Sequence, residues 1–123
     1  MTTHILALGG GGFSMSNRGE PTALDRHILD LSGKSSPLVC FAPTAAADDP
    51  VYVNRFLAAY SALGVRNMVL TLWQGAAESV ERLSQADIVV SGGGSAANLM
   101  ALWKTHGVDH VIRRMIAADS DVV

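Results

Sequence analysis

Short apolar runs alternate with amphipathic segments along the chain. The runs have the length and composition of strands that are buried on both faces, and they lie at 5–8, 38–42, 67–73 and 87–91. In the segments between them, apolar residues recur every three or four positions, as in amphipathic helices. These segments are 21–31, 50–63, 79–85, 95–106 and 108–118. The alternation predicts an α/β fold in which a parallel sheet carries helices on both faces.

Residues at the expected helix ends support these boundaries. Asp49 precedes Pro50, and this pair is typical of a helix that begins at a proline behind an aspartate N-cap. Gly64 and Gly107 follow the last apolar positions of two segments, where a glycine commonly ends a helix. We therefore expect one helix to begin at residue 50 and two helices to end before residues 64 and 107.

Residues 121–123 resemble the beginning of a fifth strand. No linker, internal repeat or low-complexity segment divides the chain, so we expect residues 1–123 to form a single, incomplete α/β domain that is truncated at the start of this strand. The edge of such a sheet is open to pairing. A homo-oligomer, or association with the missing C-terminal half, would cover it.

Composition narrows the classes of protein and partner. Hydrophobic residues make up 49% of the chain and charged residues 16%, which excludes a disordered chain. The net charge is −2 without a basic stripe, so we expect no nucleic acid. No signal peptide precedes the first strand and no apolar run approaches the roughly 20 residues of a membrane span, so we expect no membrane partner. Cys40 is the single cysteine and forms no disulfide within the chain, which fits a cytoplasmic protein.

Glycine clusters follow two of the expected strands, at Gly9–Gly12 and Gly92–Gly94. Ligands of open parallel sheets bind beyond the carboxyl ends of the strands, where glycine lets several backbone N–H groups converge on an anion or a developing oxyanion. We therefore expect Gly11, Gly12 and the second cluster to line the substrate site.

Known nucleotide-binding patterns do not fit these glycines. A dinucleotide fingerprint would require glycine at position 14 or 15, which are Ser14 and Met15. Gly33-Lys34-Ser35 resembles the end of a phosphate-binding loop, but that motif would require glycine at Ile28. We expect no cofactor and no metal.

Ser95 has two interpretations. Residues 93–97 loosely imitate the nucleophile elbow G-x-S-x-G, in which a serine attacks a carbonyl if a histidine reaches it. Alternatively, Ser95 is the N-cap of the following helix. We favour the cap because His106 and His110 lie a helix length away.

Asp48 and Asp49 also have two interpretations, because they lie beyond the second expected strand near the mouth of the cleft. They could bind a substrate α-amino group, or they could cap the helix and remain solvated. We favour capping and solvation. Cys40 lies within an apolar strand, and we expect it to be an inert core thiol.

Several segments in the same order resemble the peptidase E family of serine peptidases. They are 5–13, 41–45, 48–53, 86–95 and 98–103. The resemblance implies a three-layer, class I glutamine-amidotransferase-like (flavodoxin-like) fold. It further implies hydrolysis of short peptides, in particular dipeptides with an N-terminal aspartate, with an oxyanion hole at Gly93 or Gly94.

The resemblance also limits what this chain can supply. The family's nucleophilic serine lies in a G-x-S-A-G elbow after the fifth strand, and no position here matches it. The family usually has asparagine where this chain has Ser95, which argues against Ser95 as the nucleophile. We expect the complete protein to be an enzyme that acts through an acyl-enzyme and the 123-residue chain alone to be inactive. The alternative is a catalytically inactive α/β module that binds a small ligand or associates with itself.

Overall fold

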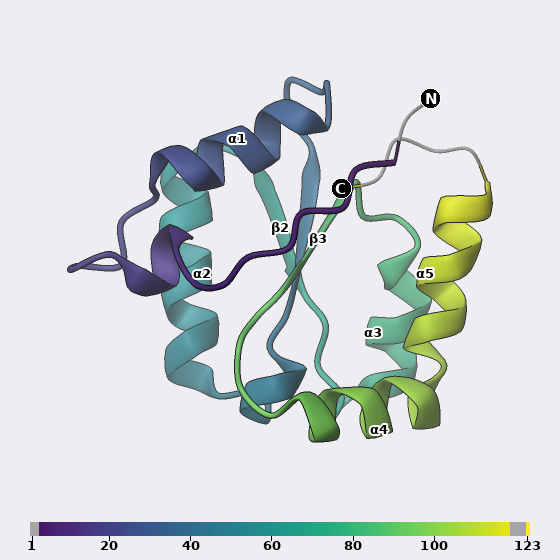
Figure 1. Ribbon diagram of the computed structural model, residues 1–123. Coiled ribbons are helices and arrows are strands. Elements are labelled where there is room, and N and C mark those ends of the chain that lie inside the picture. The colour runs from purple at the N-terminus through teal and green to yellow at the C-terminus, as the bar shows by residue number, and fades with distance from the viewer. Residues whose placement is uncertain (1–2, 119–122) are drawn as a thin grey trace.

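The computed structural model describes residues 3–118 and 123 and has an α/β architecture (Figure 1). Its three-stranded parallel sheet has the order β2-β1-β3. The strands are β1 (Leu38–Ala42), β2 (Arg66–Val69) and β3 (Ile88–Ser91). The helices are α1 (Ala23–Leu31), α2 (Pro50–Ala62), α3 (Ala76–Leu83), α4 (Ala96–His106) and α5 (Val108–Ala117), with short 3-10 turns η1 (Gly12–Met15) and η2 (Thr44–Ala46).

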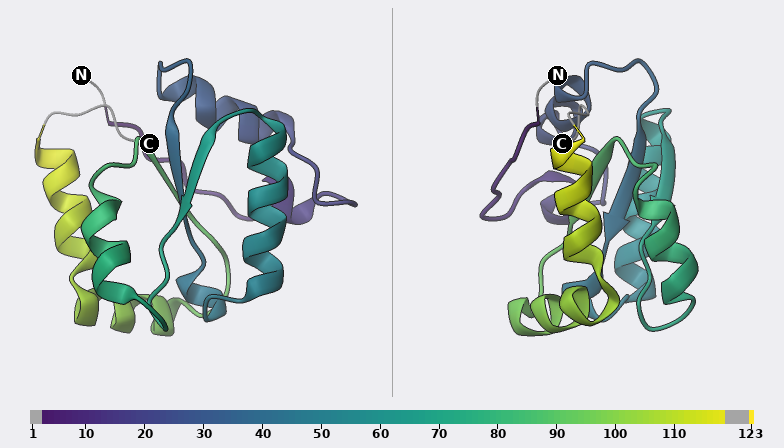
Figure 2. Two further views of the ribbon diagram at one scale, coloured as in Figure 1. Left: turned by 180° about the vertical axis from the view of Figure 1, so that it is seen from behind. Right: turned by 90° about the vertical axis from the view of Figure 1, so that its right-hand side faces the viewer.

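Alternate side chains of β1 enter two different cores, so the protein has three layers. Val39 and Phe41 pack against α1 and α2, whereas Cys40 and Ala42 pack against α3 and α5. The two helical layers lie on opposite sides of the sheet (Figures 1 and 2). This arrangement confirms the α/β, three-layer class expected from the sequence.

An aromatic cluster fixes η1 and α2 to the sheet. Phe41 of β1 stacks on Phe56 of α2 with ring centroids 4.6 Å apart, and Phe56 stacks on Tyr60 at 4.7 Å. Phe13 of η1 meets the rings of Phe41 and Phe56 edge to face. Tyr52 lies one turn before Phe56 and packs on Phe41 at 5.0 Å, which places its hydroxyl near the carboxyl end of the sheet.

The predicted helix boundaries around glycine and aspartate are confirmed. The Val51 N–H donates to the Asp49 side chain over 3.1 Å, so Asp49 is the N-cap of α2. Gly64 and Gly107 follow α2 and α4 with φ of 75° and 73°, in the left-handed region that glycine adopts without strain.

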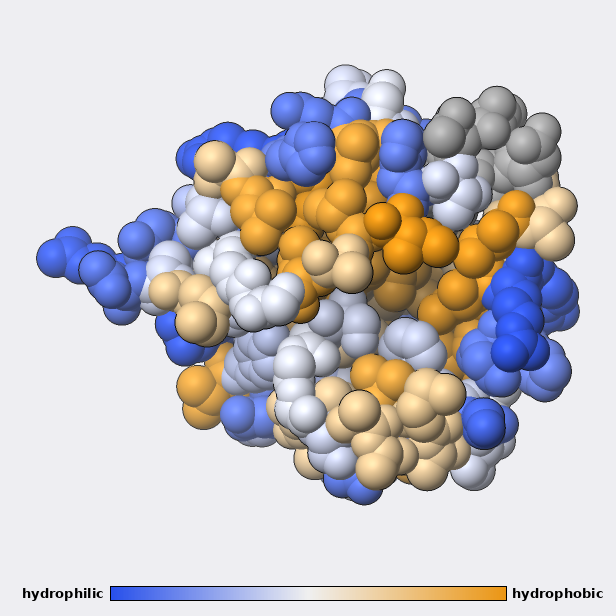
Figure 3. All heavy atoms as spheres, in the orientation of Figure 1, coloured by the Kyte–Doolittle hydropathy of each residue, from blue (hydrophilic) through white to orange (hydrophobic). Residues whose placement is uncertain are grey.

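The predicted strand at 5–8 is wrong. These residues form no strand, and Ile5 is 83% exposed. β1 is paired on both sides, and the run lies beside β3 rather than at the open edge of β2. The outer edge of β3 is instead taken by Val123, whose N–H donates to Asp87 O (3.1 Å) and whose carbonyl accepts from Val89 N–H (2.8 Å). The apolar run therefore lies beside β3 at the surface, where apolar residues gather (Figure 3).

Val123 is the described part of the predicted fifth strand. Its two bonds to β3 have the parallel ladder pattern, but residues 121 and 122 lie outside the described residues. Among the described helices, none is long and apolar enough to cross a membrane.

The third strand and the third helix begin and end earlier than predicted. β2 ends at Val69 rather than 73, because the Asp48 carboxylate accepts the N–H groups of Leu72 and Trp73 at 2.7 and 3.1 Å. α3 begins at Ala76 rather than 79, directly after Gly75, which has a φ of 64°. A long-range side-chain contact thus ends a strand that the local pattern would continue.

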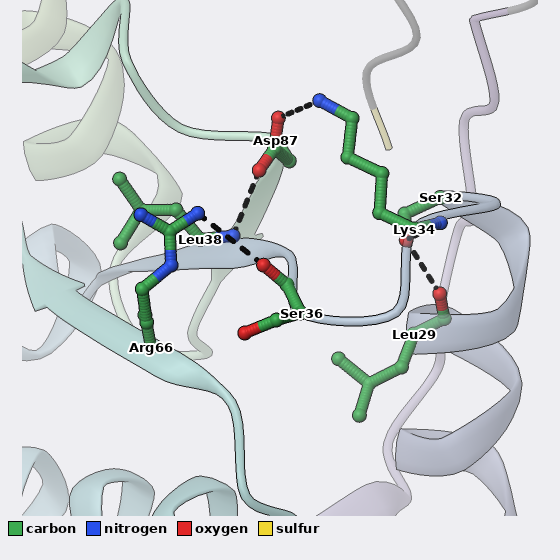
Figure 4. A network of polar contacts seen from close by, with 7 residues as sticks. All are labelled: Leu29, Ser32, Lys34, Ser36, Leu38, Arg66 and Asp87. Carbon is green, nitrogen blue, oxygen red and sulfur yellow. Dashed lines mark hydrogen bonds and ion pairs between the residues drawn. The ribbon is translucent and has the colours of Figure 1, made fainter.

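A polar network ties the amino ends of the strands together (Figure 4). Asp87 Oδ2 accepts the Leu38 N–H over 2.8 Å, and Asp87 Oδ1 pairs with Lys34. Arg66 donates to Ser36 O over 3.3 Å. Partial burial would raise the pKa of the Asp87 carboxyl, but the Leu38 N–H and the Lys34 and Arg66 cations outweigh it and lower that pKa.

Candidate active site

A pocket of about 370 Å³ lies at the carboxyl end of β3. Both glycine clusters line it, through Gly10–Gly12 of the N-terminal run and through Gly92 and Gly93. Asp25, Tyr52 and Tyr60 bring polar side chains to the same walls. The structure therefore brings together two segments about 80 residues apart in the sequence, at the edge where open parallel sheets bind ligands.

The Gly92–Gly94 turn is held against the segment that follows β1. The Gly92 N–H donates to Ala42 O over 3.0 Å, and the Ser95 N–H donates to Ala45 O over 2.7 Å. Gly94 has a φ of 142°, and a Cβ built there would lie 2.2 Å from Ala45 O. No other residue fits at 94, so this glycine is required by the close approach of two backbone segments.

Gly93 is the member of the turn that faces the pocket. It is exposed, and its N–H donates to the Tyr52 hydroxyl over 3.3 Å. Gly94 does not line the pocket, although its N–H has no hydrogen-bond partner among the described residues. Of the two predicted oxyanion donors, Gly93 is therefore the better placed, because a substrate oxygen could replace the Tyr52 hydroxyl.

Ser95 caps α4, as the favoured interpretation predicted. The Asn98 N–H donates to Ser95 Oγ over 3.2 Å. In the described part of the chain, Ser95 Oγ has no hydrogen bond to a histidine, and Ser95 does not line the pocket of the glycine turns. The geometry gives this serine no base that could activate it.

The structure does not place Asp48 and Asp49 in this pocket. Asp49 caps α2, and Asp48 holds the backbone after β2. Asp48 lines a separate hollow with Trp73 and Arg82. Cys40 is fully buried, and burial raises the pKa of its thiol to about 12, as an inert core thiol requires.

Sequence reasoning missed the polar side chains of the pocket. Tyr52 and Tyr60 lie on the apolar stripe of α2, where a tyrosine looks like a packing residue. Thr22 and Asp25 match a capping box, and the Asp25 position lies on the apolar side of α1, three residues before Ile28. The signal in the sequence was an aspartate on the apolar stripe of a helix, because a carboxylate is seldom buried unless it is paired.

The Asp25 carboxylate and the Tyr60 hydroxyl form a buried pair. Tyr60 donates to Asp25 Oδ1 over 2.9 Å. Burial and the negative charge of Asp25 raise the pKa of Tyr60, so Tyr60 remains a neutral donor. Among the described residues, no group of three or more His, Cys, Asp or Glu could hold a metal ion.

Fold and site define an α/β protein in which two glycine turns line a pocket at the carboxyl edge of a parallel sheet. Residues 5–122 match the model of Peptidase family S51, and the chain belongs to this family. The chain is 38% identical over 110 residues to YgaJ of Bacillus subtilis (strain 168), which is described as an uncharacterized peptidase. This alignment covers 89% of the chain.

A solved structure is also similar to this chain. A protein of Listeria monocytogenes EGD-e, described as a putative peptidase E protein, superposes with a TM-score of 0.59 at 26% identity, over 76% of this chain. This chain covers 47% of YgaJ and 49% of the Listeria chain, so it spans about half the length of these relatives.

Proposed function

We propose that the protein is a serine-type peptidase that hydrolyses short peptides, in particular dipeptides with an N-terminal aspartate. The observation that carries this proposal is the Gly93 N–H, exposed at the pocket with only a side-chain hydroxyl as its partner. Membership of Peptidase family S51 and the resemblance to peptidase E support it.

The proposed reaction is acyl transfer. The base takes the proton of a serine hydroxyl while the serine oxygen attacks the peptide carbonyl carbon. The carbonyl oxygen becomes an oxyanion, and the Gly93 N–H donates to it in place of Tyr52. The C–N bond then breaks, the amine leaves with a proton from the base, and water hydrolyses the resulting ester. Within the described residues no serine is paired with a histidine, so nucleophile and base are proposed to come from sequence outside these 123 residues.

The test compares two proteins on an aspartyl dipeptide. One is the 123-residue chain, and the other is an extended protein in which the chain is continued to the length of its relatives. We expect turnover by the extended protein alone. Turnover by the 123-residue chain would contradict the proposal and would identify Ser95 as the nucleophile if Ser95→Ala abolished it.

Exposed apolar residues beside β3 support an accompanying proposal, that this face is covered by another part of the protein or by a second copy. Leu6 and Leu8 are 37% and 47% exposed there. We expect light scattering to show self-association of the 123-residue chain. A monomer that unfolds cooperatively would contradict this proposal.

A further inference from the structure

Asp25 is a buried carboxylate without a cation beside it. Its exposure is 2%, and it lies in the first turn of α1 at the wall of the pocket. The ion pairs of the described residues join Lys34 to Asp87 and Arg113 to Asp109, and neither includes Asp25. Burying a charge is costly unless hydrogen bonds or a counter-ion compensate for it.

Neutral donors satisfy this carboxylate only in part. Oδ2 accepts the Thr22 N–H at 2.8 Å and the Thr22 hydroxyl at 3.0 Å, which completes the capping box. Oδ1 accepts the Tyr60 hydroxyl alone. Because a carboxylate can accept about four hydrogen bonds, one acceptor position remains, and it is on Oδ1.

This remaining position faces the N-terminal glycine turn. A Cβ built on Gly12 would lie 3.1 Å from Asp25 Oδ1 and 3.6 Å from Oδ2. Gly12 has a φ of 68° and lines the same pocket. Gly12 therefore packs closely on Asp25, and a side chain at 12 would crowd the one oxygen that can accept a further donor.

We propose that Asp25 Oδ1 binds the α-ammonium group of a peptide substrate. An ammonium group supplies both the missing donor and the missing positive charge. Gly93 lines the same pocket, and the proposal places the scissile carbonyl at the glycine turn and the free amino group of the same substrate residue at Asp25. A pocket of about 370 Å³ suits a peptide of few residues. This inference rests on the proposed function, and it assigns the amino-group site to Asp25 rather than to Asp48 or Asp49.

The test measures binding to the 123-residue chain and needs no turnover. The probes are alanyl-alanine and N-propionylalanine, which is the same molecule without its amino group. NMR titration at pH 7 should show that alanyl-alanine binds at least about tenfold more tightly, the effect of one charged hydrogen bond. Equal affinities would overturn the proposal.

Variants assign the preference to one carboxylate. Asp25→Asn removes the charge and should abolish the preference, whereas Asp30→Asn removes an exposed charge from the same helix and should keep it. Tyr60→Phe removes a neutral donor and keeps the carboxylate, so it should keep the preference too. A preference that survives in Asp25→Asn, or one that is lost in Tyr60→Phe, would contradict the proposal.

The wild-type spectrum locates the site even if Asp25→Asn does not fold. The Gly12 amide resonance should shift with alanyl-alanine and shift clearly less with N-propionylalanine at an equal, subsaturating concentration. A Gly12 resonance that stays in place with both probes would overturn the proposal. If the extended protein hydrolyses peptides but binds both probes equally, only the amino-group site fails. If it hydrolyses none and the preference for alanyl-alanine holds, only the peptidase proposal fails.

Discussion

The two ends of the sheet hold their carboxylates differently. At the amino end, Asp87 accepts a backbone N–H and faces the cations Lys34 and Arg66 (Figure 4). At the carboxyl end, Asp25 is more deeply buried and has neutral partners. At the amino end, a neutralised carboxylate stabilises the strands. At the carboxyl end, no cation of the described residues pairs with the carboxylate, which is why we propose it as the site for a substrate ammonium group.

The largest effect is expected at the Gly93 amide of the carboxyl end. Gly93→Pro removes the N–H, whereas Gly93→Ala keeps it and meets no neighbour, since nothing lies within 4 Å of a Cβ there. In the extended protein, kcat/KM for an aspartyl dipeptide should fall about 10²–10³-fold in the proline variant, as for the loss of one oxyanion donor. The alanine variant should retain nearly full activity. Equal losses in both variants would show that the backbone path, and not the N–H, matters.

Asp87→Asn should give the next largest effect, on stability. Loss of the Asp87 charge should lower the free energy of unfolding at pH 7 by about 1.5–3 kcal/mol, the range for hydrogen bonds to charged groups. Because the folded-state pKa is lowered, this stabilisation is present above the unfolded pKa of about 3.9 and is lost as pH falls through the folded value. Urea unfolding of both proteins between pH 2 and pH 7 measures the difference. A gap that stays constant to pH 2 would contradict this explanation.

Ser95→Ala should cost stability and leave catalysis intact. The side chain caps α4 through the Asn98 N–H, and such caps contribute about 1 kcal/mol. Ser95→Asp, which can also cap a helix, is the matched control and should restore stability. A loss of peptide hydrolysis in Ser95→Ala beyond its effect on folding would return Ser95 to the catalytic machinery.

Lys34→Met should have the smallest effect. The Lys34 side chain is 49% exposed, and exposed ion pairs contribute about 0.2–1 kcal/mol. The loss of stability, measured by thermal unfolding, should be well below that of Asp87→Asn, because the Leu38 N–H still donates to the carboxylate. Equal losses in the two variants would mean that the lysine, rather than the backbone, fixes Asp87.

Local sequence signals predicted the central strand and the ends of α2 and α4 well. Residues 38–42 form β1 as expected, and Asp49 and Ser95 cap α2 and α4 as predicted. The N-terminal run was misjudged because an apolar segment becomes a strand only where packing brings it to an open sheet edge, and this run lies beside β3, whose edge pairs with Val123. The pattern along the chain does not contain that information.

The glycines of the pocket were predicted from the sequence, whereas its side chains were not, because their position also depends on packing between distant segments. Both glycine clusters follow from the rule that ligands bind at the carboxyl edge of a sheet. Three polar side chains of the pocket lie on the apolar stripes of α1 and α2, where the sequence alone suggests packing residues. Packing of the helices on the sheet brings these side chains, which are Asp25, Tyr52 and Tyr60, to the glycines.

The most direct test of the account is a crystal structure of the extended protein after reaction with a dipeptide phosphonate, a mimic of the tetrahedral intermediate. We predict a phosphonyl oxygen about 2.7–3.1 Å from the Gly93 nitrogen, with the Tyr52 hydroxyl displaced from that amide. A phosphonyl oxygen directed away from the turn, with Gly93 still donating to Tyr52, would contradict the account.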